Sequence, residues 1–201
     1  MTQAGHHSMM GGKRLPYDAE VEYLKGTGTQ WIDTGVYGDE NTVVQLSVQI
    51  GSYTSNVLFG CYNANGVLFN FFVRAANWAY FQLKGSSLNT TSWGGDLDSR
   101  LDIELGNNYC KDLSSGTIVM QGDAQSSFTT DRTLKWFYYD RASSVTGRGK
   151  IFFAKIYKSG VLVQDVIPVR KGTVGYLYDR VSGALFGNAG SGDFLYGFDK
   201  I

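Results

Sequence analysis

Apolar and polar residues alternate along short runs that cover most of this chain. In residues 42–50 every second side chain is apolar, namely Val44, Leu46, Val48 and Ile50. Residues 100–105 repeat the pattern with Leu101, Ile103 and Leu105. A period of two is that of a β-strand with one face buried and the other in water. Both runs are therefore predicted to be strands that cover a common core.

Further strand-like runs follow one another to the end of the chain. They span residues 20–24, 30–34, 57–61, 67–73, 78–83, 134–139, 151–157, 161–169, 175–179, 185–186 and 194–197. No segment keeps a helical period with capping residues. The sequence thus predicts an all-β fold, a two-sheet antiparallel jelly-roll sandwich. Because both ends of the sandwich sequence are strand-like, we expect them to pair with each other.

The composition suits one sandwich domain preceded by an arm. Of the 201 residues, 26 are glycine, 2 are proline and 14% are aromatic, as expected for many strands joined by tight turns. Residues 1–14 show no period and are predicted to form an N-terminal arm that packs on a neighbour, as an anchor, or on the domain itself. Residues 15–201 are predicted to form the sandwich.

The charge pattern argues against nucleic acid as a partner. Lys and Arg number 18, as do Asp and Glu, and no long basic run is present. The first twelve residues lack the basic and apolar regions of a signal peptide, and no apolar run has the length of a membrane-spanning helix. We therefore expect no membrane partner, and assembly in a cytoplasm unless the protein leaves inside a larger particle.

Histidine and cysteine offer little chemistry. The only histidines are His6 and His7 in the arm, so the sandwich has no imidazole for a catalytic triad or a histidine-built zinc site. The two cysteines, Cys61 and Cys110, are far apart in the sequence and match no metal or redox motif. A disulfide between them stays open, but two buried thiols are the preferred interpretation.

Aromatic residues are the best candidates for recognition, because sugar rings stack on Trp and Tyr while nearby amides and carboxylates bind their hydroxyl groups. The candidates are Trp78, Tyr80 and Gln82 on one strand face, Trp93 in a loop, and Trp136, Tyr138 and Asp140 on another strand face. Phe137 and Tyr139 are then expected to point into the core. The alternative for each aromatic candidate is a core position, which is the commoner fate in a sandwich.

Several segments resemble a known family. They read Arg-Leu-Pro-Tyr at 14–17, Val-Glu-Tyr-Leu at 21–24 and Gly-Thr-Gln-Trp-Ile-Asp-Thr-Gly at 28–35. The likeness continues in order through 58–60, 133–137, 151–157, 160–169 and 175–192. Together they resemble laminin-G-like, concanavalin-A-like jelly-roll domains, of the type found in phage and prophage structural proteins of gut bacteria. That family usually has Tyr where this chain has Trp31.

The resemblance implies two packed sheets, one of them concave, and a role in glycan binding, adhesion or particle building. Some distant relatives are glycoside hydrolases with a strand of alternating acidic residues. Here Asp98, Arg100, Asp102 and Glu104 share one strand face, but the first glutamate of the hydrolase pattern is missing. We therefore interpret this run as a solvent-facing strand and expect no catalytic residue.

The resemblance also implies that calcium can bind at the rim of such a sandwich, through oxygens like those of Asp33, Asp39, Asp179 and Asp193. Ordinary turn chemistry explains an Asp beside a Gly equally well and is preferred here. No metal or other cofactor is assigned, with rim calcium left open.

The leading hypothesis is a non-enzymatic phage virion component, such as a decoration, fibre or tail-associated module. Its arm contacts other virion proteins, it forms a homo-oligomer, and its sandwich binds host or mucosal glycans. The alternative is a carbohydrate-binding or adhesion module of a bacterial cell-surface system. A glycoside hydrolase is the third candidate.

Overall fold

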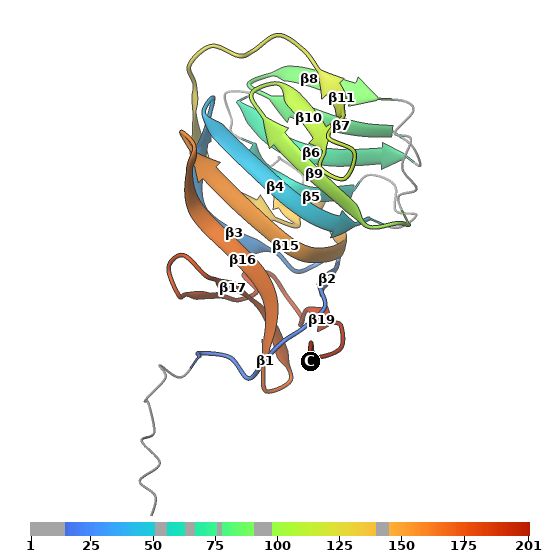
Figure 1. The fold of residues 1–201 in the computed structure, drawn as a ribbon, viewed down its shortest axis with the longest axis vertical. Coiled ribbons are helices and arrows are strands. Elements are labelled where there is room, and N and C mark those ends of the chain that lie inside the picture. Colours follow the sequence, from blue (N-terminus) through green and yellow to red (C-terminus); the bar gives the residue numbers. More distant parts are fainter. Residues whose placement is uncertain (1–14, 51–55, 63–66, 76–77, 91–97, 140–144) are drawn as a thin grey trace, which may run out of the picture.

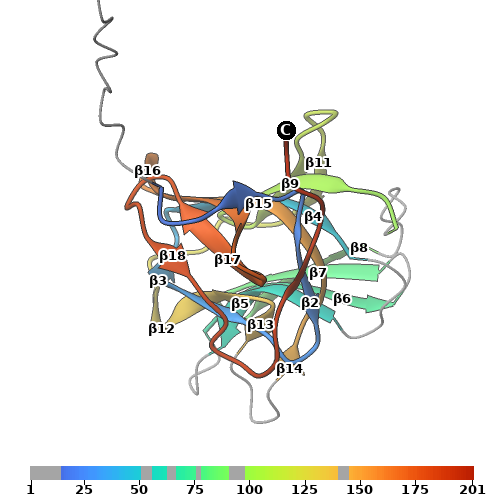
Figure 2. The same ribbon diagram turned by 90° about the horizontal axis from the view of Figure 1, so that it is seen from below.

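The computed structural model describes residues 15–50, 56–62, 67–75, 78–90, 98–139 and 145–201. Within these residues the chain forms β-strands and no helix, and every strand pairing is antiparallel. All strands but two short ones form two sheets that pack face to face (Figures 1 and 2). The predicted all-β sandwich is therefore confirmed. The predicted arm, residues 1–14, lies outside the described residues.

The large sheet joins strands from both ends of the chain. It contains β1 (Ala19–Glu20), β2 (Leu24–Thr27), β4 (Thr42–Gln49), β9 (Leu101–Gly106), β10 (Tyr109–Asp112), β11 (Ile118–Gln121), β15 (Arg148–Lys158), β16 (Val161–Lys171), β17 (Val174–Asp179), β18 (Leu185–Phe186) and β19 (Leu195–Tyr196). Its main order is β11-β10-β9-β4-β15-β16-β17-β18, with β1 beside β16, and β2 beside β15 and β19.

The small sheet has the order β3-β12-β5-β6-β7-β8. Its members are β3 (Ile32–Asp39), β5 (Asn56–Tyr62), β6 (Leu68–Ala75), β7 (Trp78–Leu83), β8 (Ser86–Thr90) and β12 (Thr129–Trp136). Two short strands, β13 (Tyr138–Tyr139) and β14 (Val145–Thr146), pair with each other.

The core lies between the two sheets. The apolar residues predicted to face inward from the first run, Val44, Leu46, Val48 and Ile50, are all fully buried. From the second run Ile103 and Leu105 are buried and Leu101 packs against the cluster, so both predicted strand faces are confirmed. The small sheet contributes mainly rings: Phe59 lies 5.7 Å from Phe69 and 4.7 Å from Trp136 between centroids, and Phe69 lies 5.7 Å from Phe81. Burial of these large side chains is the main force that holds the sheets together.

The two ends of the sandwich pair with each other, as the sequence predicts. In β2 and β19, Leu24 lies opposite Tyr196, and Val21 forms an isolated bridge with Asp199. The carboxylate of Asp199 also accepts hydrogen bonds from the guanidinium of Arg170 on β16, at 2.7 and 2.5 Å. The last residues of the chain are therefore held against its first strands.

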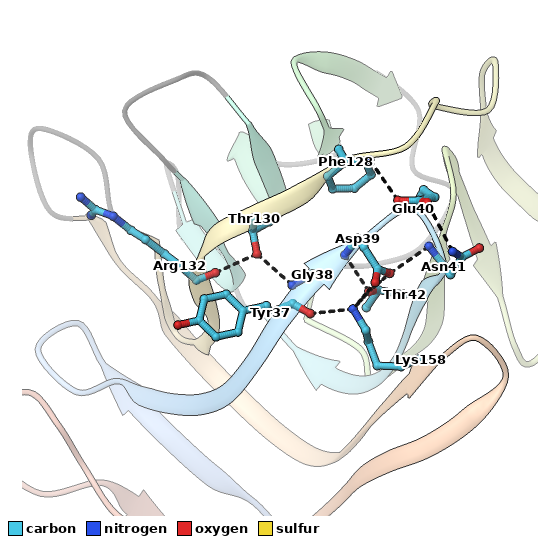
Figure 3. A network of polar contacts seen from close by, with 10 residues as sticks. All are labelled: Tyr37, Gly38, Asp39, Glu40, Asn41, Thr42, Phe128, Thr130, Arg132 and Lys158. Atoms are coloured by element: carbon cyan, nitrogen blue, oxygen red, sulfur yellow. Dashed lines mark hydrogen bonds and ion pairs between the residues drawn. The ribbon is translucent and has the colours of Figure 1, made fainter.

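The chain crosses from the small to the large sheet at the corner between β3 and β4, which a group of polar contacts closes (Figure 3). The backbone amide of Phe128 donates to the Glu40 carboxylate at 3.0 Å. The hydroxyl of Thr130 accepts from the amide of Gly38 and donates to the carbonyl of Arg132, each at 2.8 Å. These bonds fix the corner to the strand β12 that runs beside it.

Both cysteines are part of the core. Cys61 on β5 and Cys110 on β10 are fully buried, and neither forms a disulfide, so the predicted pair of buried thiols is confirmed. Among the described residues, no helix has the length and apolar character needed to cross a membrane.

Candidate functional site

Polar residues lie in one row across the outer face of the small sheet. Along this row Asp33 pairs with Lys135, Lys135 with Gly60, Gly60 with Asn70, and Asn70 with Gln82. Directly paired residues of neighbouring strands point to the same side of a sheet. The next row along the strands holds the core rings described above and faces inward, so the row of polar residues faces outward. We call this row and the rings beside it the small-sheet face.

Asn70 occupies the centre of this face and is fully buried. Both atoms of its side-chain amide are buried and have no hydrogen-bond partner within the described part of the chain. The neighbouring Gly60 makes the close fit possible, because a Cβ atom there would lie 2.3 Å from the Cβ of Asn70. Buried polar groups are nearly always hydrogen-bonded, and an exception often marks a functional position. The hydroxyl group of a ligand is the kind of partner that this amide lacks, and it reaches the amide only when the side chains that cover Asn70 move aside.

Aromatic rings lie beside the row on β6 and β7. Tyr80 on β7 is the direct partner of Phe72 on β6, with ring centroids 6.4 Å apart and both side chains half-buried. Each lies two residues from a member of the row, Phe72 from Asn70 and Tyr80 from Gln82. The structure therefore places the predicted candidates Tyr80 and Gln82 together on one face, with Asn70 and Phe72 beside them.

A second pair of rings lies near the other end of the row. Trp31 and Tyr138 stack with centroids 5.0 Å apart and an angle of 23° between their planes. The ammonium of Lys135 lies 5.7 Å from the Trp31 centroid and 5.9 Å from that of Tyr138, within the range of a cation–π contact. Tyr138 is a predicted candidate, whereas sequence reasoning missed Trp31, Lys135 and Asn70 as members of a site.

The sequence does carry signals for two of these three residues. Trp31 directly precedes the buried Ile32 and so has the parity of the opposite face. Asn70 is the single polar residue in the run Leu-Phe-Asn-Phe-Phe-Val at 68–73. No comparable signal marks Lys135, which resembles any lysine of an amphipathic strand.

The prediction that Trp136 and Tyr138 share one strand face as candidates for glycan binding is wrong for Trp136. Trp136 is only 1% exposed and packs on Phe59 in the core. The next residue, Phe137, is also buried, as predicted, and has a positive φ of 63°. This left-handed residue breaks the alternation, so that Trp136 and Phe137 both enter the core and Tyr138 leaves it.

Three predicted site candidates, Trp78, Trp93 and Asp140, and one predicted core residue, Tyr139, are not tested by the structure. Trp93 and Asp140 lie outside the described residues, and for Trp78 and Tyr139 only the backbone strand is described. They stay predictions.

The acidic strand lies on the large sheet, where its carboxylates make cross-strand hydrogen bonds. Glu104 accepts from the amide of Gln45 and from the hydroxyl of Tyr109, each at 2.8 Å. Burial, together with this bond to Glu104, raises the pKa of Tyr109 well above its ordinary value. Asp102 accepts from the hydroxyl of Ser47 and from the guanidinium of Arg100. These partners favour the interpretation as a solvent-facing strand over a catalytic carboxylate pair.

The aspartates considered for calcium serve the local backbone. Asp33 accepts from the amide of Gly35 at 2.9 Å, and Asp39 pairs with Lys158. Asp179 accepts from the amides of residues 165, 181 and 182. Asp193 is exposed, and its main-chain carbonyl accepts from Gln30 at 3.2 Å. Within the described ranges, no group of three or more His, Cys, Asp or Glu side chains could hold a metal ion.

The side chains on the outer faces of the two sheets are the basis for inferring a function. Comparison with models of known protein families, with curated proteins and with solved structures finds no match to this chain.

Proposed function

We propose that this protein is a non-enzymatic adhesion module that binds glycan chains across the small-sheet face. The observation that carries the proposal is the row of polar side chains, flanked by two pairs of aromatic rings and centred on Asn70, whose amide has no hydrogen-bond partner in the described part of the chain. Rings offer flat apolar surfaces to the C–H faces of sugars, and amides offer both donors and acceptors to hydroxyl groups.

The layout suits a chain of sugars more than a single one. The row crosses five strands, from Asp33 on β3 to Gln82 on β7. Neighbouring strands lie about 4.8 Å apart, so the row extends over roughly 19 Å, or several sugar rings. A shallow site of this kind binds weakly, and many copies on one particle would strengthen the attachment.

The setting that we propose is a phage virion, in which the protein serves as a decoration, fibre or tail-associated module with a jelly-roll topology. This rests on the resemblance of residues 14–35 and of the later segments to laminin-G-like domains of phage structural proteins. In this setting residues 1–14 contact other virion proteins and the sandwich faces outward. The cross-strand bonds of Asp102 and Glu104 support a binding role over glycoside hydrolysis.

A glycan array tests the binding role. We expect the wild-type protein to bind a set of neutral glycans and the variants Tyr80→Ala and Gln82→Ala to lose most of that signal. The matched control is Tyr157→Ala, which removes a half-buried tyrosine from the large sheet. Equal signals for wild type and Tyr80→Ala, or an equal loss in Tyr157→Ala, would contradict binding at the small-sheet face.

Mass spectrometry of purified phage particles tests the setting. Many copies of the chain per particle are expected, and deletion of residues 1–12 should abolish incorporation. If the protein is found on bacterial cells and not in particles, the alternative of a cell-surface adhesion module replaces the virion role. Normal incorporation of the truncated protein would refute the arm as the anchor.

A further inference from the structure

The strands β15 and β16 part after a short stretch of pairing. Residues 19–27 run across the opening between them (Figure 1). The two strands pair only from Ala154 opposite Val166 to Lys158 opposite Val161. Beyond that stretch β2 becomes the partner of β15, and β1 the partner of β16. A surface pocket of about 530 Å³ is lined by residues of β1, β15 and β16, by Glu22 and Tyr23 just before β2, and by Arg100, Arg180 and Lys200 from neighbouring segments. We call it the β15–β16 pocket.

The pocket has an aromatic floor. An irregularity in β15 places Ile151 opposite Val48 but Phe153 opposite Ser47, so Phe152 is an extra residue. As a result both Phe152 and Phe153 line the pocket, where regular alternation would have buried one of them. The ring of Tyr23 meets that of Phe152 edge to face, with centroids 5.9 Å apart.

The rim of the pocket is basic although the whole chain is neutral. Its lining includes five basic side chains against two glutamates, the basic ones being Arg100, Lys150, Lys155, Arg180 and Lys200. Both glutamates have partners: Glu22 accepts from the amide of Phe198 at 3.3 Å, and Glu20 from the hydroxyl of Tyr17 at 3.4 Å. An excess of positive charge over an apolar floor favours an anion that also has an apolar face.

Two of these cations are held in place by the floor itself. The guanidinium carbon of Arg100 lies 4.7 Å from the Phe152 centroid, and its Nε donates to Ser47 at 2.6 Å. The ammonium of Lys150 lies 4.4 Å from the Tyr23 centroid. Cations fixed in this way lose little freedom when a ligand binds, which favours affinity.

Lys155 is a cation of the pocket whose nearest acidic neighbour across the strands is already engaged. Its neighbour across the sheet, Asp165, is already paired with Arg180 through two hydrogen bonds of 3.0 and 3.1 Å. Within the described residues neither Lys150 nor Lys155 forms an ion pair with a carboxylate. The charge of both ammonium groups is thus left for a ligand.

We infer that the β15–β16 pocket binds a carboxylated sugar residue, with its ring on Phe153 and Tyr23 and its carboxylate between Lys150 and Lys155. A sugar residue of this class combines one negative charge with an apolar ring face. The basic side chains of the rim match the charge, and the aromatic floor matches the ring face. The volume lies within the usual range for small-molecule sites, about 300–1,000 Å³. This site lies on the opposite sheet from the small-sheet face and does not depend on the function proposed for it.

Calorimetric titration of the full chain with matched sugars tests the inference. The probes are 3′-sialyllactose and trigalacturonate as carboxylated sugars, 3′-sulfolactose as a sulfated one, and lactose as the neutral reference. At least one carboxylated probe should bind about tenfold more tightly than lactose, and this preference should weaken as salt is added.

Variants assign the binding to the pocket. Lys155→Gln should lower the affinity for the carboxylated probe about tenfold. Phe153→Ala should also lower the affinity for this probe, because the sugar ring loses the aromatic ring on which it packs. Lys111→Gln, on β10 of the same sheet, removes the same charge outside the pocket and should change little. Tyr80→Ala should also leave this affinity unchanged, which separates the pocket from the small-sheet face.

Three results would overturn the inference: no binding of either carboxylated probe, a preference for 3′-sulfolactose alone, or equal losses in Lys155→Gln and Lys111→Gln. Because Phe153→Ala removes a large ring, its melting temperature is measured alongside. If Phe153→Ala does not fold, the surface substitution Lys155→Gln decides the question.

Discussion

The ammonium of Lys158, at the end of β15 in the large sheet, donates to the carboxylate of Asp39, at the end of β3 in the small sheet (Figure 3). The same ammonium donates to the carbonyl of Tyr37 at 2.8 Å and to the hydroxyl of Thr42 at 3.1 Å. Both charged side chains are about three-quarters buried, with exposures of 26% and 24%. One lysine thus ties together the corner where the chain passes from one sheet to the other.

Replacing Lys158 should therefore weaken the whole sandwich. In Lys158→Met the Asp39 carboxylate keeps its burial but loses its charged partner, and we expect the free energy of unfolding to fall by about 2 kcal/mol. Urea denaturation measures this. Lys171→Met, at an exposed position on β16, is the control and should change stability by less than about 0.5 kcal/mol. Similar losses in both variants would contradict a special role for the corner.

The same pair predicts a pH dependence. Burial by itself raises the pKa of Asp39, but hydrogen bonds from Lys158 and Thr42, together with the charge of Lys158, lower it below the ordinary value of 3.8. A carboxyl group whose pKa is lower in the folded state stabilises the fold fully above its unfolded pKa, and this contribution is lost as pH falls through the folded pKa.

The stability advantage of wild type over Asp39→Asn should therefore be constant near neutral pH and shrink below pH 3.8. Urea denaturation at a series of pH values measures it. In the Lys158→Met background this pH dependence should weaken, because the hydrogen bond and the charge of Lys158 no longer lower the pKa of Asp39, whereas the opposing effect of burial remains. If the stability difference between wild type and Asp39→Asn grows as the pH falls, the pKa of Asp39 is not lowered in the folded protein.

Much of this architecture follows from alternation alone. The period of two in β4 and β9 identifies the residues that reach the core, and the strand-like ends of the sandwich do pair. Alternation cannot reveal a left-handed residue such as Phe137 or an extra residue such as Phe152, and each of these changes which side chains reach the surface. The false placement of Trp136 and the unforeseen aromatic floor both come from this limit.

The row of polar residues required more than parity. Tyr80 and Gln82 could be placed on one strand face from the sequence, because neighbours two apart share a face. That Asn70 and Lys135 join them depends on the register between strands that are far apart in the chain. Register depends on the packing of the whole sheet and cannot be predicted from the pattern of a single strand.

Gly60 should be one of the least replaceable residues of the small sheet. Its φ of 153° is rare for other residues, and an added Cβ would lie 2.3 Å from the Asn70 Cβ and 2.6 Å from the Phe69 carbonyl oxygen. We expect Gly60→Ala to cost more than about 3 kcal/mol. Gly116→Ala, where φ is also positive but no atom lies within 4 Å, should cost about 1 kcal/mol. Thermal melting compares them, and equal losses would show that the close approach has no cost.

The two cysteines should be inert in the folded protein. Both are fully buried, and burial, with the nearby charge of Asp112, raises the pKa of the Cys110 thiol well above its ordinary value. The reactive form of cysteine is the thiolate, so labelling by iodoacetamide should be very slow in native buffer and complete in denaturant. Mass spectrometry counts the labels. Rapid labelling of Cys110 under native conditions would show that β10 opens readily.

Asn70 offers the sharpest test of the small-sheet face, because stability and binding should move in opposite directions. Its amide is buried and has no hydrogen-bond partner among the residues that the structure describes. Asn70→Leu therefore removes an unsatisfied polar group, and we expect the free energy of unfolding to rise by about 1 kcal/mol.

Asn70→Leu should also weaken binding about tenfold for a glycan that binds the wild-type protein on the array, since a hydroxyl group of the ligand loses its hydrogen-bond partner. Asn107→Leu is the matched control. The Asn107 amide accepts from the backbone of Gln125 at 2.8 Å and donates to it at 3.1 Å, so its loss should destabilise the protein by about 1–2 kcal/mol and leave glycan binding unchanged. Urea denaturation and titration with the glycan measure both effects. If Asn70→Leu destabilises the fold as Asn107→Leu does, or binds the glycan as wild type does, Asn70 is a structural residue and the proposed site loses its centre. A gain in stability with a loss of binding is instead the signature of a polar group that is retained for its ligand.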